Sequence, residues 1–222
     1  MNDSGYTAVV FGASGLTGRF VTEHLIHDNR YSKILLFVRE EIPVSSKKIN
    51  QVIFNPEKVD SISSELIGDH LFCCLGTTIK KAGSKKVFYS IDHDLVVKIA
   101  TIAAANNFRS FVVISSIGAN YKSKNFYLNT KGKMEESLKS FKFENLSVVR
   151  PSILLGLRHE RRMTEEVGKV LMKVIAPLLI GKLSKYRPIH SSTVAKSMIK
   201  LANLPSGVHI FESDQLEKLI TS

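Results

Sequence analysis

Hydrophobic and polar positions alternate between two patterns along most of this chain. Short apolar runs rich in β-branched residues predict strands at residues 6–11, 33–38, 50–54, 71–75, 110–115 and 146–150. Between them, apolar residues recur with a helical period, which predicts helices at about 15–27, 60–66, 92–107 and 126–141. Apolar strands separated by helices are typical of a parallel sheet that is covered on both faces. The pattern therefore predicts an α/β fold with a doubly wound parallel sheet.

The last third of the chain continues the same pattern less regularly. Amphipathic stretches predict helices at 164–175 and 191–204, and the run at 208–212 predicts one more strand before a terminal helix. No internal repeat or long linker interrupts the 222 residues. A chain of this length can bury one substantial core. We therefore predict a single domain over residues 1–222, with about 151–222 forming a small C-terminal lobe.

The composition is that of an ordinary folded protein, with 44% hydrophobic and 23% charged residues. The first ten residues lack the basic flank and apolar core of a secretory signal, so a cytoplasmic location is expected. The most apolar stretch, 170–180, is interrupted by Lys173 and Pro177 and is shorter than the ~20 residues that cross a bilayer. We therefore expect no membrane span.

The charge of the chain is strongly positive, with a formal net value of +11. Such a field attracts anions, from phosphorylated cofactors to nucleic acids and acidic membrane surfaces. The basic residues are scattered in short clusters, without the long run that is typical of a nucleic-acid arm. We therefore expect a solvated basic surface and no nucleic-acid partner.

A glycine-rich turn joins the first predicted strand to the first predicted helix. Its candidate binding residues are Gly12, Ser14, Gly15, Leu16, Thr17 and Gly18. Glycines permit the turn, a close approach to a pyrophosphate and tight helix–strand packing. The helix N-terminus adds free N–H groups and positive partial charge. The spacing G-x-x-G-x-x-G is neither the usual dinucleotide fingerprint nor a Walker loop. The turn predicts a diphosphate site, with a plain packing turn as the alternative.

The end of the second predicted strand bears on which dinucleotide would bind. NAD-binding chains usually present an acidic residue there to the ribose hydroxyls. Here Arg39 comes first, and a guanidinium can pair with a 2′-phosphate. We therefore predict NADP as the cofactor. Glu40 and Glu41 follow directly, so NAD remains the alternative.

A second group of polar residues follows the fifth predicted strand. Ser115 and Ser116 end this strand, and Tyr127 and Lys131 stand four residues apart on the next predicted helix, where they share a face. A tyrosine–lysine pair alone is common as a surface contact. Its position after a strand-end serine, in a chain that opens with a nucleotide turn, indicates a catalytic set.

With these motifs, the chain resembles the short-chain dehydrogenase/reductase superfamily, in particular its small atypical members of the Tat-interacting-protein group. The resemblance is carried by VFGASGLTGR, CCLGTT, VVISSIGA, the Tyr127–Lys131 pair and VVRPSILLG. It implies a Rossmann-like fold with bound NADP(H), Tyr127 as proton donor or acceptor, and Lys131 on the nicotinamide ribose, where its charge also favours the phenolate. Ser115 or Ser116 would orient a carbonyl, and the sequence leaves open which of them does.

The resemblance also implies further cofactor contacts. Leu75 and Gly76 follow the fourth strand where the family's backbone passes beneath the cofactor, Leu154 corresponds to the wall beside the nicotinamide, and Arg162 to a residue that contacts the cofactor or closes the site. Each also has a plain structural interpretation, as a strand-end turn, a core residue or a surface charge.

The sequence gives little support for a disulfide, a metal site or a further catalytic acid. Cys73 and Cys74 are adjacent and would point to opposite faces of a strand, which favours reduced core thiols. The histidines show no metal-ligand spacing, so no metal is expected. Asp92 is interpreted as a helix N-cap rather than as a catalytic acid.

Two functions remain in competition. The first is an NADP(H)-dependent oxidoreductase that acts on a small carbonyl or alcohol substrate, with the C-terminal lobe on the substrate side. The second is a non-catalytic NADPH-binding protein that regulates a protein partner. The intact Ser, Tyr and Lys set favours the enzyme. The sequence leaves the substrate and a homo-oligomeric state open.

Overall fold

The predicted doubly wound sheet is present and contains seven parallel strands. The computed structural model describes residues 5–156 and 179–221, apart from the side chain of Lys182. Across the sheet the strands run in the order β3-β2-β1-β4-β5-β6-β9. Their bounds are β1 Tyr6–Phe11, β2 Tyr31–Val38, β3 Ile49–Ile53, β4 His70–Cys73, β5 Ser110–Ile114, β6 Asn145–Arg150 and β9 Gly207–Glu212. The order reverses between β1 and β4, which is where open α/β sheets bind ligands.

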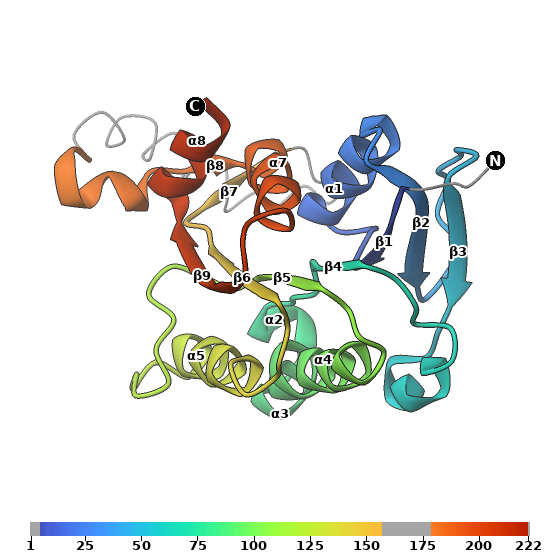
Figure 1. The fold of residues 1–222 in the computed structure, drawn as a ribbon. Helices are drawn as coiled ribbons and strands as arrows, with labels where there is room; N and C mark the ends of the chain where they lie inside the picture. Colours follow the sequence, from blue (N-terminus) through green and yellow to red (C-terminus); the bar gives the residue numbers. More distant parts are fainter. Residues whose placement is uncertain (1–4, 157–178, 222) are drawn as a thin grey trace.

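Helices cover both faces of the sheet, as Figure 1 shows. One layer contains α1 (Leu16–His27), α7 (Ser191–Leu201) and α8 (Ser213–Thr221). The other contains α2 (Ile79–Ala82), α3 (Lys85–Tyr89), α4 (Val96–Ala105) and α5 (Phe126–Leu138). A short parallel pair, β7 (Leu154–Leu155) and β8 (Ile189–His190), lies apart from the main sheet.

Each face of the sheet has its own hydrophobic core. On β1, Val9 and Phe11 belong to the core with α4 and α5, whereas Ala8 and Val10 belong to the core with α1 and α7. Successive residues of a strand point to opposite faces, so a strand buried on both sides is apolar at most positions. This explains why the sequence shows continuous apolar runs instead of alternation.

The predicted strands are all present, with ends that move by one or two residues. β2 begins at Tyr31 rather than residue 33, and β4 ends at Cys73 rather than residue 75. The short helix predicted at 60–66 is a 3-10 helix at Pro56–Ile62. The helix predicted at 164–175 lies outside the described residues.

The prediction that Asp92 is an N-cap is wrong. Helical backbone begins earlier, with α3, and continues through a π-helical turn at Ser90–Leu95 into α4. Asp92 lies within the π-helical turn and is fully buried. The periodicity could not reveal this, because Ile91 and Leu95 fit a helix that starts at either place.

Within residues 5–156 and 179–221, no helix is both long and apolar enough to cross a bilayer. The same part of the chain contains no group of three side chains placed to hold a metal ion. Cys73 and Cys74 are both free thiols, and burial raises the pKa of Cys73 to about 12. Cys73 is buried, whereas Cys74 is half-buried and borders the cavity described below.

Candidate active site

A cavity of about 420 Å³ opens at the carboxyl edge of the sheet. The strands β1, β4, β5 and β6 end there, and the residues that follow each of them form its walls. The lining residues are Ser14, Gly15, Leu16, Thr17, Arg19, Cys74, Leu75, Gly76, Thr77, Thr78, Lys81, Asp92, Ile114, Ser115, Ser116, Tyr127, Lys131, Pro151, Ser152 and Leu154. The fold thus brings together segments from four parts of the sequence.

The glycine turn forms the cavity wall beside α1. Gly12 has a φ of +80°, and its carbonyl accepts a hydrogen bond from the N–H of Gly15 at 2.9 Å. A Cβ on Gly18 would lie 2.1 Å from the carbonyl oxygen of Gly12, so this position admits only glycine. Gly12 and Gly18 set the backbone path of the turn. The cavity is lined by Ser14, Gly15, Leu16 and Thr17.

The N-terminus of α1 can bind an anion. Its N-cap is Gly15, which provides no side-chain hydrogen bond to the first turn. The first N–H groups of the helix therefore remain available at the cavity wall, together with the positive end of the helix dipole. This geometry fits the diphosphate of a nicotinamide dinucleotide.

Arg39 follows β2 directly, as predicted, and is exposed. It does not line the cavity. A second cation, Arg19, does line it from the first turn of α1. The sequence analysis missed Arg19, although a basic residue immediately after the third glycine is a signal that could have found it. Besides Lys81 and Lys131, the cavity therefore has an arginine, Arg19, in its wall, and another arginine, Arg39, follows the adjacent strand β2.

Tyr127 and Lys131 lie one turn apart on α5, and both line the cavity. The ring of Tyr127 packs against Phe88 of α3, with centroids 5.5 Å apart. Lys131 is only 3% exposed, and its Nζ lies 2.7 Å from Oδ1 of Asp92. Burial disfavours the charge of Lys131, but attraction to Asp92 and then to Tyr127 outweighs burial and raises the pKa of the ammonium.

The two candidate serines have different surroundings. Ser115 is 4% exposed and donates its hydroxyl hydrogen to the carboxylate of Glu135 on α5. Glu135 is itself buried and accepts a hydrogen bond from Nε of Arg150 at 3.0 Å. Ser116 is half-buried, and among the described residues its hydroxyl makes one long contact, 3.3 Å, with the carbonyl of its neighbour Ile117. Both line the cavity, but only the hydroxyl of Ser115 is engaged by a charged partner.

Leu75, Gly76 and Leu154 all line the cavity, and Arg162 lies outside the described residues. The sequence analysis missed several other lining residues. Thr77 and Thr78 could have been found as the polar continuation of the strand-end motif CCLGTT. No local signal identifies Asp92, because its role as a lining residue depends on the π-helical turn.

Comparison with known proteins agrees with this geometry. A family model described as NAD(P)H-binding matches residues 12–203. Protein HTATIP2 of Rattus norvegicus is 37% identical over 164 residues, which cover 72% of this chain and 67% of the relative. Protein FMP52, mitochondrial, of Eremothecium gossypii is 31% identical over 219 residues, which cover 96% of each chain.

These relatives overturn the cytoplasmic location expected from the N-terminal residues. The FMP52 proteins of Eremothecium gossypii and of Kluyveromyces lactis, each 31% identical over 96% of this chain, are named mitochondrial. The expectation failed because it used the absence of a secretory signal, which bears on secretion and does not distinguish the cytoplasm from an organelle.

Solved structures support the fold. The ADP-L-glycero-D-manno-heptose-6-epimerase of Helicobacter pylori superposes with a TM-score of 0.70 at 15% identity, covering 99% of this chain and 81% of the epimerase. MoeE5 in complex with UDP-glucose and NAD gives a TM-score of 0.68 at 12% identity, covering 95% of this chain and 79% of MoeE5. With a family model that spans residues 12–203 and a relative 37% identical over 72% of this chain, the chain belongs to the NAD(P)H-binding family, as an atypical short-chain dehydrogenase/reductase related to HTATIP2.

Proposed function

We propose that this protein is an NADP(H)-dependent oxidoreductase that interconverts a carbonyl compound and an alcohol. The observation that supports this most directly is the shared cavity: Tyr127 and Lys131 line the same space as the free N-terminus of α1. A protein that only bound a dinucleotide would have little need of the phenol beside it.

Each side chain has a separate task. Reduced nicotinamide, when bound, supplies the hydride. Tyr127 gives the proton to the carbonyl oxygen, or takes it from the alcohol in the reverse direction. Lys131 binds the nicotinamide ribose, and its positive charge stabilises the phenolate left after proton transfer. Leu75, Gly76 and Leu154 form the wall along which the cofactor lies.

We assign the carbonyl-orienting role to Ser116 rather than Ser115. The proton of Ser115 is directed to Glu135, whereas the hydroxyl of Ser116 has, among the described residues, only the 3.3 Å contact with the carbonyl of Ile117 and can turn to donate into the cavity. Ser116→Ala is expected to lower kcat for carbonyl reduction about 100-fold, because one donor to the developing oxyanion is lost. Steady-state rates of NADPH oxidation would measure this.

The matching variant Ser115→Ala is expected to act on stability instead. It leaves the buried Glu135 with one donor fewer, which costs about 1–3 kcal/mol, and thermal unfolding would detect the loss. A larger fall in kcat for Ser115→Ala than for Ser116→Ala, with both variants folded, would reverse the assignment.

The preference for NADP over NAD is supported by Arg39 at the end of β2 and by Arg19 in the cavity wall. Arg39→Ala is expected to raise the Kd for NADPH about 10- to 100-fold, the usual worth of a hydrogen bond to a charged group, and to leave the Kd for NADH unchanged. Titration of cofactor fluorescence measures both values. Lys33→Ala, an exposed cation on the same strand, is the control. Equal losses for both cofactors would contradict a 2′-phosphate contact.

The activity is tested by measuring NADPH and NADH binding and then screening carbonyl substrates with the preferred cofactor. Turnover that depends on Tyr127 supports the enzyme. Tight NADPH binding without turnover of any carbonyl or alcohol would favour a regulatory protein that acts through a partner.

We also propose a mitochondrial location, on the strength of the FMP52 relatives. Fractionation of cells that express the full chain, with markers for cytosol and mitochondria, tests it. Recovery in the cytosolic fraction alone would refute it.

A further inference from the structure

The charged segment after β2, residues 39–41, contains side chains that suit different cofactors. Arg39 can pair with a 2′-phosphate, whereas Glu40 and Glu41 can accept hydrogen bonds from the ribose hydroxyls of NAD. All three side chains are exposed. The backbone path of the charged segment therefore decides which cofactor it favours, because only a side chain that faces the adenosine ribose can bind it.

The charged segment begins beside the glycine turn. β1 and β2 pair in parallel, with Phe11 opposite Phe37. Gly12 follows Phe11 directly, and Arg39 comes two residues after Phe37, so both lie at the carboxyl edge on neighbouring strands. In Rossmann-like folds the adenosine ribose of the dinucleotide meets the end of this second strand. The position of the charged segment therefore fits a contact with the ribose.

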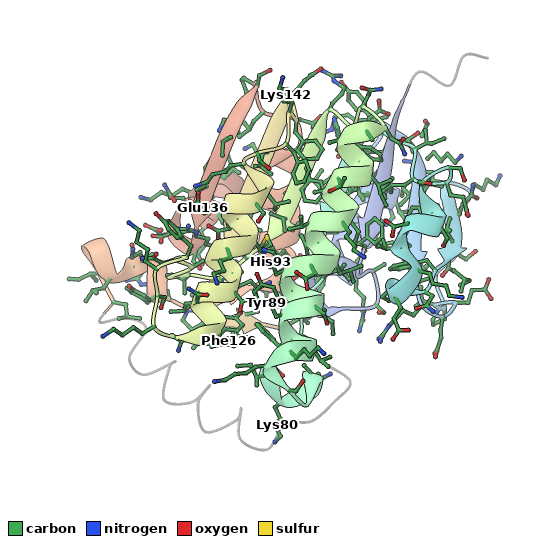
Figure 2. All side chains as sticks on the ribbon, turned by 90° about the horizontal axis from the view of Figure 1, so that it is seen from below. Lys80, Tyr89, His93, Phe126, Glu136 and Lys142 are labelled. Atoms are coloured by element: carbon green, nitrogen blue, oxygen red, sulfur yellow. The ribbon has the colours of Figure 1, made fainter. Side chains whose placement is uncertain are left out.

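Both ends of the charged segment are hydrogen-bonded to β3 or to the residue that follows it. β3 is the outermost strand on one side of the sheet, at the right in Figure 1 and again at the right in Figure 2, which is seen from below. At the first end, the N–H of Phe54, directly after β3, donates to the carbonyl oxygen of Val38 at 2.9 Å. This bond continues the sheet up to the last residue of β2.

At the second end, the side-chain amide of Gln51 on β3 uses both of its polar atoms on one residue, Ile42. Its Oε1 accepts a hydrogen bond from the N–H of Ile42 at 3.0 Å, and its Nε2 donates to the carbonyl oxygen of Ile42 at 2.9 Å. Both bonds are partly buried, so water competes with them less than at an open surface. The next residue is Pro43, which restricts Ile42 to extended conformations. Only the charged segment lies between the two fixed points.

The two bonds of Gln51 to Ile42 are additional to those that hold the sheet. The backbone of β3 already pairs with β2 from Ile49 to Ile53, with Gln51 opposite Leu36. The side chain of Ile42 also packs against the hydrophobic core beneath α1. The fold therefore has other support at this place, and the bonds of the Gln51 amide act mainly on the path of the charged segment.

We propose that Gln51 is a positioning residue for cofactor choice. By bonding Ile42 to β3, it holds Arg39, rather than Glu40 or Glu41, toward the adenosine ribose and so favours NADP over NAD. This inference rests on the proposed preference for NADP. It does not rest on carbonyl turnover, because it concerns cofactor binding alone.

The first test compares the wild type with Gln51→Met. Methionine keeps the length of the side chain and removes both hydrogen bonds to Ile42. We expect the Kd for NADPH to rise about tenfold, the size of one lost coupling, because Arg39 is then no longer held at the 2′-phosphate. The Kd for NADH should change less than about twofold, since Arg39 has no phosphate to contact there. Titration of cofactor fluorescence measures both values.

The second test asks whether Gln51 acts through Arg39. Gln51→Met is combined with Arg39→Ala and compared with Arg39→Ala alone. The two proteins should bind NADPH equally, because the arginine that Gln51 positions is absent from both. A further rise in the Kd for NADPH in the double variant would show that Gln51 acts by another route, and it would overturn the inference.

The hydrogen bonds themselves are tested by amide hydrogen exchange, measured by NMR without cofactor. In Gln51→Met the N–H of Ile42 should exchange faster than in the wild type, while the N–H of Phe54 should keep its protection. Asn50→Met is the matched control. Asn50 is the exposed neighbour of Gln51 on β3, and its side chain makes no hydrogen bond to any described residue. This variant should leave both Kd values and the exchange of Ile42 unchanged.

The outcomes separate this inference from the proposed function. A folded Gln51→Met protein that keeps the full preference of the wild type for NADPH overturns the inference alone, as do equal losses for NADPH and NADH. A wild type that binds NADH as tightly as NADPH overturns the proposed cofactor preference and this inference with it. A wild type that prefers NADPH but reduces no carbonyl counts against the oxidoreductase only. If Gln51→Met does not fold, Gln51→Asn, whose amide is shorter by one methylene, replaces it in every measurement.

Discussion

Replacing Tyr127 by phenylalanine is expected to lower the rate of carbonyl reduction about 10³-fold, while the Kd for NADPH changes less than about twofold. The phenol oxygen is the only group removed, and it acts on the substrate oxygen in the transition state rather than on the bound cofactor. The ring should keep its packing against Phe88, at a centroid distance of 5.5 Å, so the fold is preserved. Steady-state kinetics and cofactor titration on the same preparation measure the two effects.

Tyr121→Phe is the control for this experiment. Tyr121 is 46% exposed in the loop before α5 and does not line the cavity. It should retain the wild-type rate and stability. A Tyr127→Phe protein as active as the wild type would remove Tyr127 from the chemistry, and the oxidoreductase proposal would lose its proton donor.

Gly18→Ala is expected to have the largest effect on the fold. The added methyl would lie 2.1 Å from the carbonyl oxygen of Gly12 and 2.7 Å from its carbonyl carbon, which are backbone atoms that no rotamer change can move. The cost of such overpacking is about 3 kcal/mol, or a fall in Tm of about 6–12 °C for a chain of this size. Displacing the glycine turn also removes the anion site, so NADPH binding should be lost at all accessible concentrations.

Gly76→Ala is the control for Gly18→Ala. It tests whether any methyl group added to the cavity wall destabilises the protein. Its Cβ would meet the nearest atoms at ordinary contact distances, 3.5 Å and 3.7 Å. We expect its thermal stability to equal that of the wild type, measured by calorimetry beside Gly18→Ala. A Gly18→Ala protein with native Tm and native NADPH affinity would show that the turn can widen, contrary to the close approach described above.

Much of the fold could be predicted, because its signals are local. The apolar runs at residues 8–11 of β1 and 111–114 of β5 are continuous, since both faces of these strands are buried. The parallel direction of the strands follows from their alternation with helices. α1 and α5 could be predicted because their apolar residues recur with a helical period. Prediction failed at Pro56–Ile62, where the periodicity missed a 3-10 helix that Asn55 caps, and at the π-helical turn Ser90–Leu95.

The site was only partly predictable, for a related reason. Tyr127 and Lys131 could be found because a helix brings residues four apart to one face. The hydrogen-bond partner of Ser115 could not be predicted. Ser115 and Glu135 are 20 positions apart, and in the sequence Glu135 looks like any other charged residue on an amphipathic helix. Only contact with Arg150 across the sheet shows that it is a buried hydrogen-bond acceptor.

The sequence by itself determined the alternation of strands and helices, the glycine turn and the spacing of the tyrosine–lysine pair, because each is encoded in neighbours along the chain. The tertiary structure alone decided that Asp92 is buried beside Lys131, that the hydroxyl of Ser115 donates to Glu135, and that Arg19 lines the cavity. The contacts of Asp92 with Lys131 and of Ser115 with Glu135 each join two separate elements. They depend on how helices pack across a sheet, and no local periodicity carries that information.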